Sequence, residues 1–224
     1  MTTEGRLLDL GLRDYADVWK LQLKLLDLRV RKAIPDTLIL VQHPHVFTVG
    51  KAVPGDVPNT VDGVPVYRIE RGGQWTYHGP GQLVGYPILD LNERQRDIHS
   101  FLRNIEETLI QALIKFSITG ERQEQTGVWV GKKKIASIGA AIRNWVSLHG
   151  FALNVNTDLN YFELISPCGF PGSTMTSMKA LLGNEIDFRS VTTEVRGNFE
   201  KAFDIKLIDT EVETLEPLQS PSKM

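Results

Sequence analysis

RGGQWTYHGPGQ, residues 71–82, combines residues typical of a loop with residues typical of a binding site. Its four glycines and one proline favour turns and a close approach of the backbone to other groups. Trp75, Tyr77 and His78, by contrast, are large side chains that a solvent-exposed linker seldom carries. A tight turn at the first glycine pair, followed by a short strand over 74–78, accommodates both features.

Alternate side chains of this strand would point to opposite faces. One face would carry Gln74, Thr76 and His78, and the other would carry Trp75 and Tyr77. The composition also fits an ordinary hairpin whose aromatic rings pack in a core. The separation of a polar face from an apolar one favours the wall of a site, with a core behind it.

Three familiar motifs are excluded by their spacing. Gly79, Gly81 and Gly85 follow a GxGxxxG pattern and lead into a strand, whereas a dinucleotide fingerprint needs GxGxxG and a helix. GVWVGK, residues 127–132, is one residue shorter than a P-loop, and no serine or threonine follows its lysine. HPH, residues 43–45, has no third or fourth ligand spaced to join it, so we expect no metal.

The length of 224 residues suits one large domain or two small ones. We expect one domain over 1–210 and a disordered tail over 211–224, which is acidic and then rich in serine and proline. A net charge of −2 gives no argument for nucleic acid or a membrane as a partner. No apolar run approaches the roughly 18 residues of a membrane span, no signal peptide is visible, and a single cysteine excludes an internal disulfide. We therefore expect a cytoplasmic location.

Hydrophobic periodicity predicts an α+β fold, because helices and strands come in blocks rather than in regular alternation. Strands are expected at 37–41, 65–70, 74–78, 82–91, 149–156 and on either side of a tight turn at Gly131-Lys132. Helices are expected at 14–32, 97–117, 175–182 and 190–203. The predicted buried face of the first helix consists of Ala16, Trp19, Leu23, Leu26 and Val30.

Cys168, the only cysteine, lies in SPCGFPG, residues 166–172. A lone cysteine is usually a small buried hydrophobic residue. Here Pro167 and Gly169 indicate a turn outside the deep core, and the glycine leaves the sulfur approachable, which favours a nucleophile. A thiol with an ordinary pKa of about 8.5 needs a base or a cation beside it to react at neutral pH. The candidates are His43, His45, His78, His149 and the lysine run 132–134.

The lysine run 132–134 would ordinarily be a solvated turn. If 133–139 forms a strand, however, Lys134 shares a face with Ala136 and Ile138 and points inward. Burial among apolar groups pushes the pKa of a lysine down, toward the range in which its amine acts as a base.

Several motifs together resemble the octanoyltransferases, or lipoyl(octanoyl) transferases, of lipoate biosynthesis. These motifs are RGGQWTYHGPGQLVGYP, GVWV, KIASIG, HGFALNV and SPCG, in that order within residues 5–205. The resemblance implies the fold of the lipoate and biotin ligase catalytic domain, an α/β unit with a mixed β-sheet flanked by helices. It also implies an acyltransferase without a cofactor. Such an enzyme moves an octanoyl group from octanoyl-acyl carrier protein to the target lysine of a lipoyl domain, through an acyl-cysteine thioester.

The same resemblance implies roles for individual positions. The nucleophile falls on Cys168 in the PCG motif, and the activating lysine falls on Lys134 in the KIASIG motif. The implied substrate-binding positions are Arg71, Gly72, Gly73, Gln74, Trp75, Thr76, Tyr77, His78, Ser137, Ile138, Gly139, Gly150, Phe151 and Ala152. Trp75 departs from the family, which often carries a β-branched residue there, and this difference could alter the acyl length that is accepted.

The implied acceptors are the lipoyl domains of 2-oxoacid dehydrogenase E2 subunits and the glycine cleavage H protein. Neither nucleic acid nor a membrane is an expected partner. Four alternatives stay open at this point: an ATP-dependent lipoate ligase, an octanoyl amidotransferase acting between lipoyl-bearing proteins, a non-catalytic acyl-binding module and a thioester hydrolase. The ligase would need an adenylate site, and the amidotransferase would differ only in its donor.

Overall fold

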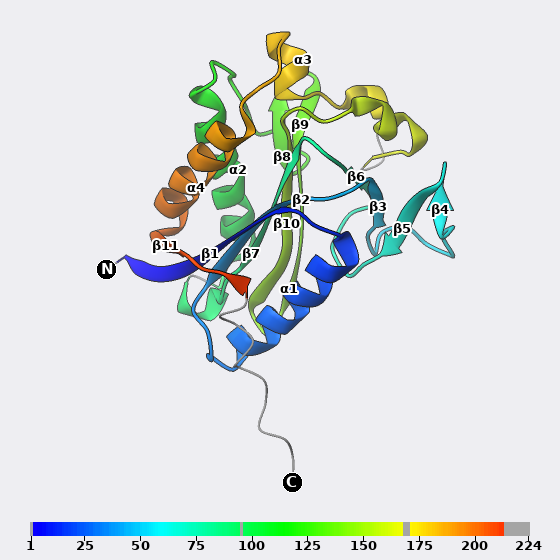
Figure 1. Cartoon of the computed structure of the whole chain (residues 1–224). Coiled ribbons are helices and arrows are strands. Elements are labelled where there is room, and N and C mark those ends of the chain that lie inside the picture. Colours follow the sequence, from blue (N-terminus) through cyan, green and yellow to red (C-terminus); the bar gives the residue numbers. More distant parts are fainter. Residues whose placement is uncertain (1, 95, 168–170, 213–224) are drawn as a thin grey trace.

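The computed structural model describes residues 2–94, 96–167 and 171–212, which form two β-sheets and the helices around them (Figure 1). The elements, in chain order, are β1 (Thr3–Leu12), α1 (Tyr15–Val30), β2 (Thr37–Gln42), β3 (Val46–Val49), β4 (Thr60–Val61), β5 (Val64–Arg68), β6 (Trp75–His78), β7 (Gln82–Ile88), η1 (Leu91–Glu93), α2 (Ile98–Ile114), β8 (Gly127–Val130), β9 (Lys133–Arg143), β10 (Val146–Asn154), η2 (Leu159–Leu164), η3 (Gly172–Thr174), α3 (Met178–Leu182), α4 (Phe188–Phe203) and β11 (Ile205–Asp209).

The larger sheet has the strand order β11-β1-β2-β7-β10-β9-β8. Strand β1 pairs in parallel with both β11 and β2, whereas the strands from β2 to β8 pair antiparallel. Helices α2 and α4 lie on one side of this sheet and α1 lies on the other (Figure 1). The prediction of a mixed sheet flanked by helices is therefore confirmed.

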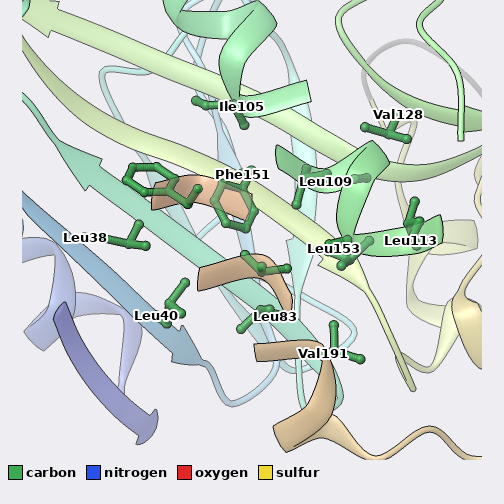
Figure 2. Packing of buried hydrophobic residues seen from close by; sticks show 14 of the residues in the cluster. Leu38, Leu40, Leu83, Ile105, Leu109, Leu113, Val128, Phe151, Leu153 and Val191 are labelled. Carbon is green, nitrogen blue, oxygen red and sulfur yellow. The ribbon is translucent and has the colours of Figure 1, made fainter. Parts of the chain in front are cut away.

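The central strands are apolar along their whole length because both of their faces are covered. In β2, Leu38 and Leu40 point toward α2 and α4, and Ile39 and Val41 point toward α1. On the α2 and α4 side, Leu38, Leu40 and Leu83 of the sheet meet Leu109 of α2 and other aliphatic side chains (Figure 2). A continuous apolar run such as residues 37–41 is what a strand buried on both faces requires.

Helix α1 begins where expected, since the Asp14 carboxylate accepts hydrogen bonds from the backbone N–H groups of Ala16 and Asp17. Its predicted buried face is wrong in part. Ala16, Trp19, Leu23 and Val30 are only partly buried, and Leu26 alone of the predicted face is buried. The face that packs against the sheet consists of Tyr15, Val18, Gln22, Leu25, Leu26, Leu28 and Arg29. Because this face includes a buried glutamine and a buried arginine, hydrophobicity alone does not reveal it.

The smaller sheet has the order β4-β5-β3-β6 and contains the expected strand of the glycine-rich stretch, β6. Strand β6 pairs antiparallel with β3, which places Val49 opposite Trp75 and Val46 opposite His78. Strands β1, β3, β4 and β11 were not expected from the sequence. In the described part of the chain, no helix has the length and apolar character needed to cross a membrane.

Gly150 of β10 tests how closely the central strands pack. A Cβ atom added at this position would lie 2.2 Å from the Gly85 carbonyl oxygen in β7, a backbone atom that cannot move without shifting the strand. We expect Gly150→Ala to lower the free energy of unfolding by about 1–3 kcal/mol, measured by urea denaturation. The control is Gly197→Ala in α4, where an added Cβ meets no atom within 4 Å. It should stabilise the helix by about 0.5–1 kcal/mol. Equal effects of the two changes would contradict this account of the packing.

Candidate acyl-transfer site

The two faces of β6 have the different environments that the alternation predicts. Thr76 and His78 line a pocket between β6 and the strands β9 and β10. Trp75 and the fully buried Tyr77 face the opposite way and pack in a cluster with Phe47. The predicted separation of the two faces is confirmed, with a pocket on one side of β6 and a core on the other, and the use of this pocket as a binding site stays a prediction.

The pocket has a cavity volume of about 40 Å³, and about 420 Å³ when the open solvent at its mouth is included. Nine predicted substrate-binding residues line it, namely Arg71, Thr76, His78, Ser137, Ile138, Gly139, Gly150, Phe151 and Ala152. Three segments distant in sequence thus meet at one cavity. In the sheet, Ser137 pairs with Ala152, and Gly139 pairs with Gly150.

Five of the predicted positions do not line this pocket. Gly72, Gly73 and Gln74 belong to the turn before β6, where the Gly72 N–H donates to the carbonyl of Ala140 at 3.2 Å. Trp75 and Tyr77 lie on the far face of β6. The reason is the two-residue period of a strand, which gives consecutive residues opposite directions.

Tyr77 instead supports the segment that leads to Cys168. Its ring stacks on that of Tyr161 in η2 with centroids 4.9 Å apart, and its hydroxyl donates to or accepts from His45 Nδ1 at 2.7 Å. Phe162, also in η2, meets the same ring edge to face. The aromatic side of β6 therefore fixes η2, which ends four residues before the cysteine.

Arg71 is held in the pocket wall by backbone groups. One guanidinium nitrogen donates to the Gly72 carbonyl at 2.9 Å, and another donates to the Thr48 carbonyl at 2.9 Å and to the Thr48 hydroxyl at 3.0 Å. The side chain is buried. It therefore brings a fixed positive charge to the pocket.

A buried hydrogen-bond chain fixes the protonation of His78. The Gln82 amide donates to the carbonyl of Tyr77 and to Asn154 Oδ1, so its Oε1 is left as an acceptor 2.7 Å from His78 Nδ1. His78 Nδ1 therefore carries the proton, and Nε2 is an acceptor. Burial lowers the pKa of His78 to about 3, which keeps the ring neutral.

Lys134 is almost completely buried at the beginning of β9, as the sequence predicts. Its Nζ donates to the Thr126 carbonyl at 3.0 Å and lies 5.3 Å from the centroid of the Trp129 ring. Gly127 leaves room for this side chain, because a Cβ atom there would lie 2.5 Å from Lys134 Cε. Lys132 and Lys133, in contrast, are exposed. The structure therefore separates one buried amine from two on exposed side chains, of which Lys133 Nζ donates to the Ser173 carbonyl.

Strict alternation is not what turns Lys134 inward. The register between β8 and β9 shifts, so that Val128 lies opposite Ala136 whereas Trp129 lies opposite Lys134. Ile135 is therefore an extra residue of a β-bulge, which interrupts the two-residue period. The prediction of an inward lysine is confirmed, but its assumption of a regular strand is wrong.

Cys168 lies outside the described residues, as does most of the predicted tail. The residues on either side of the cysteine segment are placed. Pro167 forms a parallel bridge with Trp75, and Met175 forms a parallel bridge with Lys134. The Thr176 N–H also donates to the Lys134 carbonyl at 2.9 Å. The segment that contains the cysteine thus begins beside β6 and ends beside Lys134.

The other histidines occupy separate positions rather than a common metal site. His43 is buried, with Nδ1 2.8 Å from the Arg13 carbonyl and Nε2 2.9 Å from the Tyr86 hydroxyl. Burial lowers the pKa of His43 to about 4. Burial also lowers the pKa of His149, although Glu70 opposes this effect. Among the described residues, no group of three or more histidine, cysteine or acidic side chains is arranged to hold a metal ion.

Sequence reasoning missed three residues of the pocket, Tyr15, Ile69 and Tyr86. Tyr15 begins α1, and its ring stacks on that of His78 with centroids 6.0 Å apart. Tyr86 lies in β7 and contacts His43. Tyr15 belongs to no local motif, so the sequence alone gives no signal for it. Tyr86 lies within the motif RGGQWTYHGPGQLVGYP, but outside the positions to which a binding role is assigned.

A mixed sheet flanked by helices, with a pocket between its strands and those of a smaller sheet, is the architecture to compare with known catalytic domains. The family model of the lipoyl protein ligase A/B catalytic domain matches residues 14–200. Among solved structures, a putative lipoate protein ligase from Thermoplasma acidophilum has a TM-score of 0.70 at 18% identity, with 96% of this chain and 93% of that chain covered. Biotin protein ligase from Aquifex aeolicus has a TM-score of 0.51 at 13% identity, with 90% and 69% covered. The chain therefore belongs to the lipoyl protein ligase A/B catalytic domain family.

A relative with higher sequence identity than these solved structures narrows the assignment within the family. An octanoyltransferase of Flavobacterium psychrophilum is 41% identical over 229 residues, which cover 91% of this chain and 98% of the relative. At this identity and coverage the chain is a member of the octanoyltransferases, a group of acyltransferases, as its motifs predict.

The buried neutral histidines predict a loss of stability in mild acid. In the unfolded chain a histidine titrates with a pKa of about 6.5, whereas folded His43 and His78 have pKa values of about 4 and about 3. Between pH 6.5 and these lower values the unfolded state binds more protons, so the free energy of unfolding falls as the pH falls. At pH 5 the loss is about 2 kcal/mol for each histidine relative to pH 7.

Urea denaturation at pH 7 and pH 5 measures this difference. Replacing the exposed His99, as His99→Asn, should leave the difference unchanged. Imidazole NMR signals of His43 and His78 that titrate near pH 6.5 in the folded protein would contradict the assignment.

Proposed function

We propose that the protein transfers an octanoyl group from octanoyl-acyl carrier protein to the target lysine of lipoyl domains, through a thioester on Cys168. The proposed acceptors are 2-oxoacid dehydrogenase E2 subunits and the glycine cleavage H protein. Lys134 is the proposed acid–base partner of the thiol. The pocket lined by residues of β6, β9 and β10 is the proposed site of the acyl chain.

One observation carries this proposal. The short segment that contains the only cysteine is anchored at both ends, by Pro167 beside Trp75 and by Met175 beside Lys134. Trp75 directly precedes Thr76 of the pocket wall. The cysteine therefore belongs to a stretch that begins near the pocket and ends at the buried lysine.

The histidines are poor alternatives to Lys134 as the base. A base works best when its pKa lies near the operating pH. Burial leaves His43 and His78 with pKa values of about 4 and about 3, too low to remove a thiol proton efficiently at neutral pH. His45 is occupied by the Tyr77 hydroxyl on the far side of β6. These observations favour the lysine.

In the first half-reaction, the Lys134 amine takes the proton of the Cys168 thiol, and the two groups form an ion pair. The thiolate attacks the carbonyl carbon of the octanoyl thioester, forming a new C–S bond. The old C–S bond then breaks, and the pantetheine thiolate takes the proton back from the lysine ammonium. The exchange of one thioester for another is nearly neutral in energy.

In the second half-reaction, the neutral amine of the acceptor lysine attacks the carbonyl of octanoyl-Cys168. A C–N bond forms, the C–S bond breaks, and Lys134 accepts a proton from the attacking nitrogen. That proton restores the cysteine thiol. Because an amide is more stable than a thioester, this step runs downhill, and the reaction needs no ATP to activate the acyl group.

The pocket supports recognition of a medium-length acyl chain. Ile69, Ile138, Phe151 and Ala152 provide apolar lining. At about 0.8 kcal/mol per buried CH₂ group, an octanoyl chain contributes on the order of 5 kcal/mol to binding. One methylene more or less changes recognition by about 1–3 kcal/mol, so neighbouring chain lengths should be poorer substrates rather than excluded ones.

The covalent step is tested by incubating the protein with octanoyl-acyl carrier protein, without ATP and with EDTA, and measuring its intact mass. We expect one added octanoyl group, lost on treatment with hydroxylamine, because the chain has a single thiol. Cys168→Ser should abolish stable labelling and transfer. Wild-type transfer by Cys168→Ala would refute the covalent mechanism. Strict dependence on ATP, with free octanoate as the donor, would indicate a ligase instead.

The three adjacent lysines provide a matched test of the base. Lys134→Ala and Lys134→Arg should reduce kcat/KM by at least about 10²–10⁴-fold, because alanine has no amine and arginine stays protonated. Lys132→Ala and Lys133→Ala should stay near the wild-type rate or lose only salt-sensitive affinity for an acidic carrier protein. The alkylation rate of Cys168 should move to higher pH in Lys134→Ala alone. If Lys132→Ala or Lys133→Ala instead caused a severe loss of kcat/KM and the same shift of the alkylation rate to higher pH, the assignment of this role to Lys134 would be wrong.

A further inference from the structure

One part of the pocket is unusually polar for a cavity that receives an alkyl chain. The hydroxyl of Tyr15 and both ring nitrogens of His149 are buried without a hydrogen-bond partner among the described residues. Each of the two residues is only 2% exposed, and both line the pocket. A buried polar group without a partner is costly, so these atoms point to a ligand that completes their hydrogen bonds.

The backbone of His149 adopts a strained conformation, and a neighbouring side chain holds it there. Its φ angle is +60°, which is uncommon for a residue other than glycine, and its backbone N–H donates to Gln22 Oε1 at 3.0 Å. Its Nε2 lies 3.6 Å from Glu70 Oε2, too far for a hydrogen bond but close enough for that carboxylate to favour a proton on Nε2. This tautomer leaves Nδ1 as an acceptor.

The strand register places this polar group at the end of the pocket remote from Lys134. The Lys134 amine lies beside Gly127, where an added Cβ atom would be 3.1 Å from Nζ, and Gly127 pairs with Ser137 of β9. Ala140, opposite His149, lies three residues beyond Ser137. At about 3.3 Å per residue this distance along the strand is roughly 10 Å, which an extended octanoyl chain can span. An acyl group with its carbonyl near Lys134 therefore points its last carbons toward His149 and Tyr15.

We propose that Tyr15 and His149 form a hydrogen-bonding site for a neutral hydroxyl at the end of the acyl pocket, so that medium-chain acyl groups with a terminal hydroxyl are accepted as substrates. This proposal rests on the proposed acyl transfer and deepens it. Water occupies the site when the acyl chain ends in a methyl group. A longer alkyl chain displaces that water without replacing its hydrogen bonds, which makes the site a limit on chain length.

The charges around the site favour a hydroxyl over an ion. Glu70 disfavours a carboxylate or a phosphate, and its pKa, lowered to about 2 chiefly by interaction with His149, keeps it ionised. Arg71 in the same wall disfavours an ammonium group. A hydroxyl can donate to His149 Nδ1 and accept from the Tyr15 hydroxyl, which matches the two unpartnered groups.

The test compares the pantetheine thioesters of octanoate, 8-hydroxyoctanoate and decanoate as donors. If the end of the pocket were apolar, the terminal hydroxyl would lower kcat/KM by about 10- to 100-fold. With the polar site, kcat/KM for 8-hydroxyoctanoyl should lie within about fivefold of that for octanoyl. It should also be higher than kcat/KM for decanoyl. Tyr15→Phe should lower the ratio of 8-hydroxyoctanoyl to octanoyl by about tenfold. Tyr67→Phe is the control, because that ring stacks on Tyr15 but does not line the pocket.

Calorimetric binding of free octanoic and 8-hydroxyoctanoic acid separates this proposal from the transfer reaction. Comparable affinities in the wild type support the polar site even if no donor is turned over. So does a loss of affinity in Tyr15→Phe that is about tenfold larger for the hydroxy acid than for octanoic acid. Two outcomes would overturn the polar site and leave the transfer function intact. One is transfer of octanoyl with a kcat/KM about 100-fold lower for 8-hydroxyoctanoyl. The other is a ratio of kcat/KM for 8-hydroxyoctanoyl to that for octanoyl that Tyr15→Phe does not change.

Discussion

The site depends on a buried chain of hydrogen bonds that joins the pocket to the segment beside Lys134. It runs from His78 to Gln82, from Gln82 to Asn154, and from the Asn154 amide to the Thr176 carbonyl, each contact between 2.7 and 2.9 Å. The Thr176 N–H in turn donates to the Lys134 carbonyl. Four segments that are distant in sequence are thereby held in one arrangement. Because every donor in this chain has a partner, the network fixes geometry without leaving an unsatisfied amide in the core.

Much of this arrangement can be predicted from the sequence, and the limits have physical reasons. The polar and apolar faces of β6 follow from local alternation, and so does the site wall. The pattern of 133–139 also predicts that Lys134 points inward, but the sequence does not reveal the bulge at Ile135, which interrupts the regular strand. Strand β1 gives little local signal, because its partner β11 is about 200 residues away and its own pattern is only partly apolar.

The residues that sequence reasoning missed share one property: they act through tertiary contacts. Tyr15 reaches the pocket from the first turn of α1, where it looks like an ordinary core residue. The role of Tyr77 is also invisible locally, since it depends on stacking with Tyr161 more than 80 residues later. The motif predicts that the whole of segment 71–78 binds substrate. Which of its residues line the pocket and which support it from behind becomes visible only in the three-dimensional structure.

The protonation states in the pocket reconcile its polar lining with an apolar ligand. A protonated histidine would have to lose most of its hydration when an alkyl chain enters, whereas a neutral one loses much less. Burial lowers the pKa of both His78 and His149, so both rings stay neutral. They retain hydrogen-bonding capacity without a charge, and Arg71 is compensated by backbone carbonyls. The wall can therefore orient a carbonyl or a hydroxyl while still accepting methylene groups, and in the proposed reaction the positive charge at the reacting atoms is assigned to Lys134.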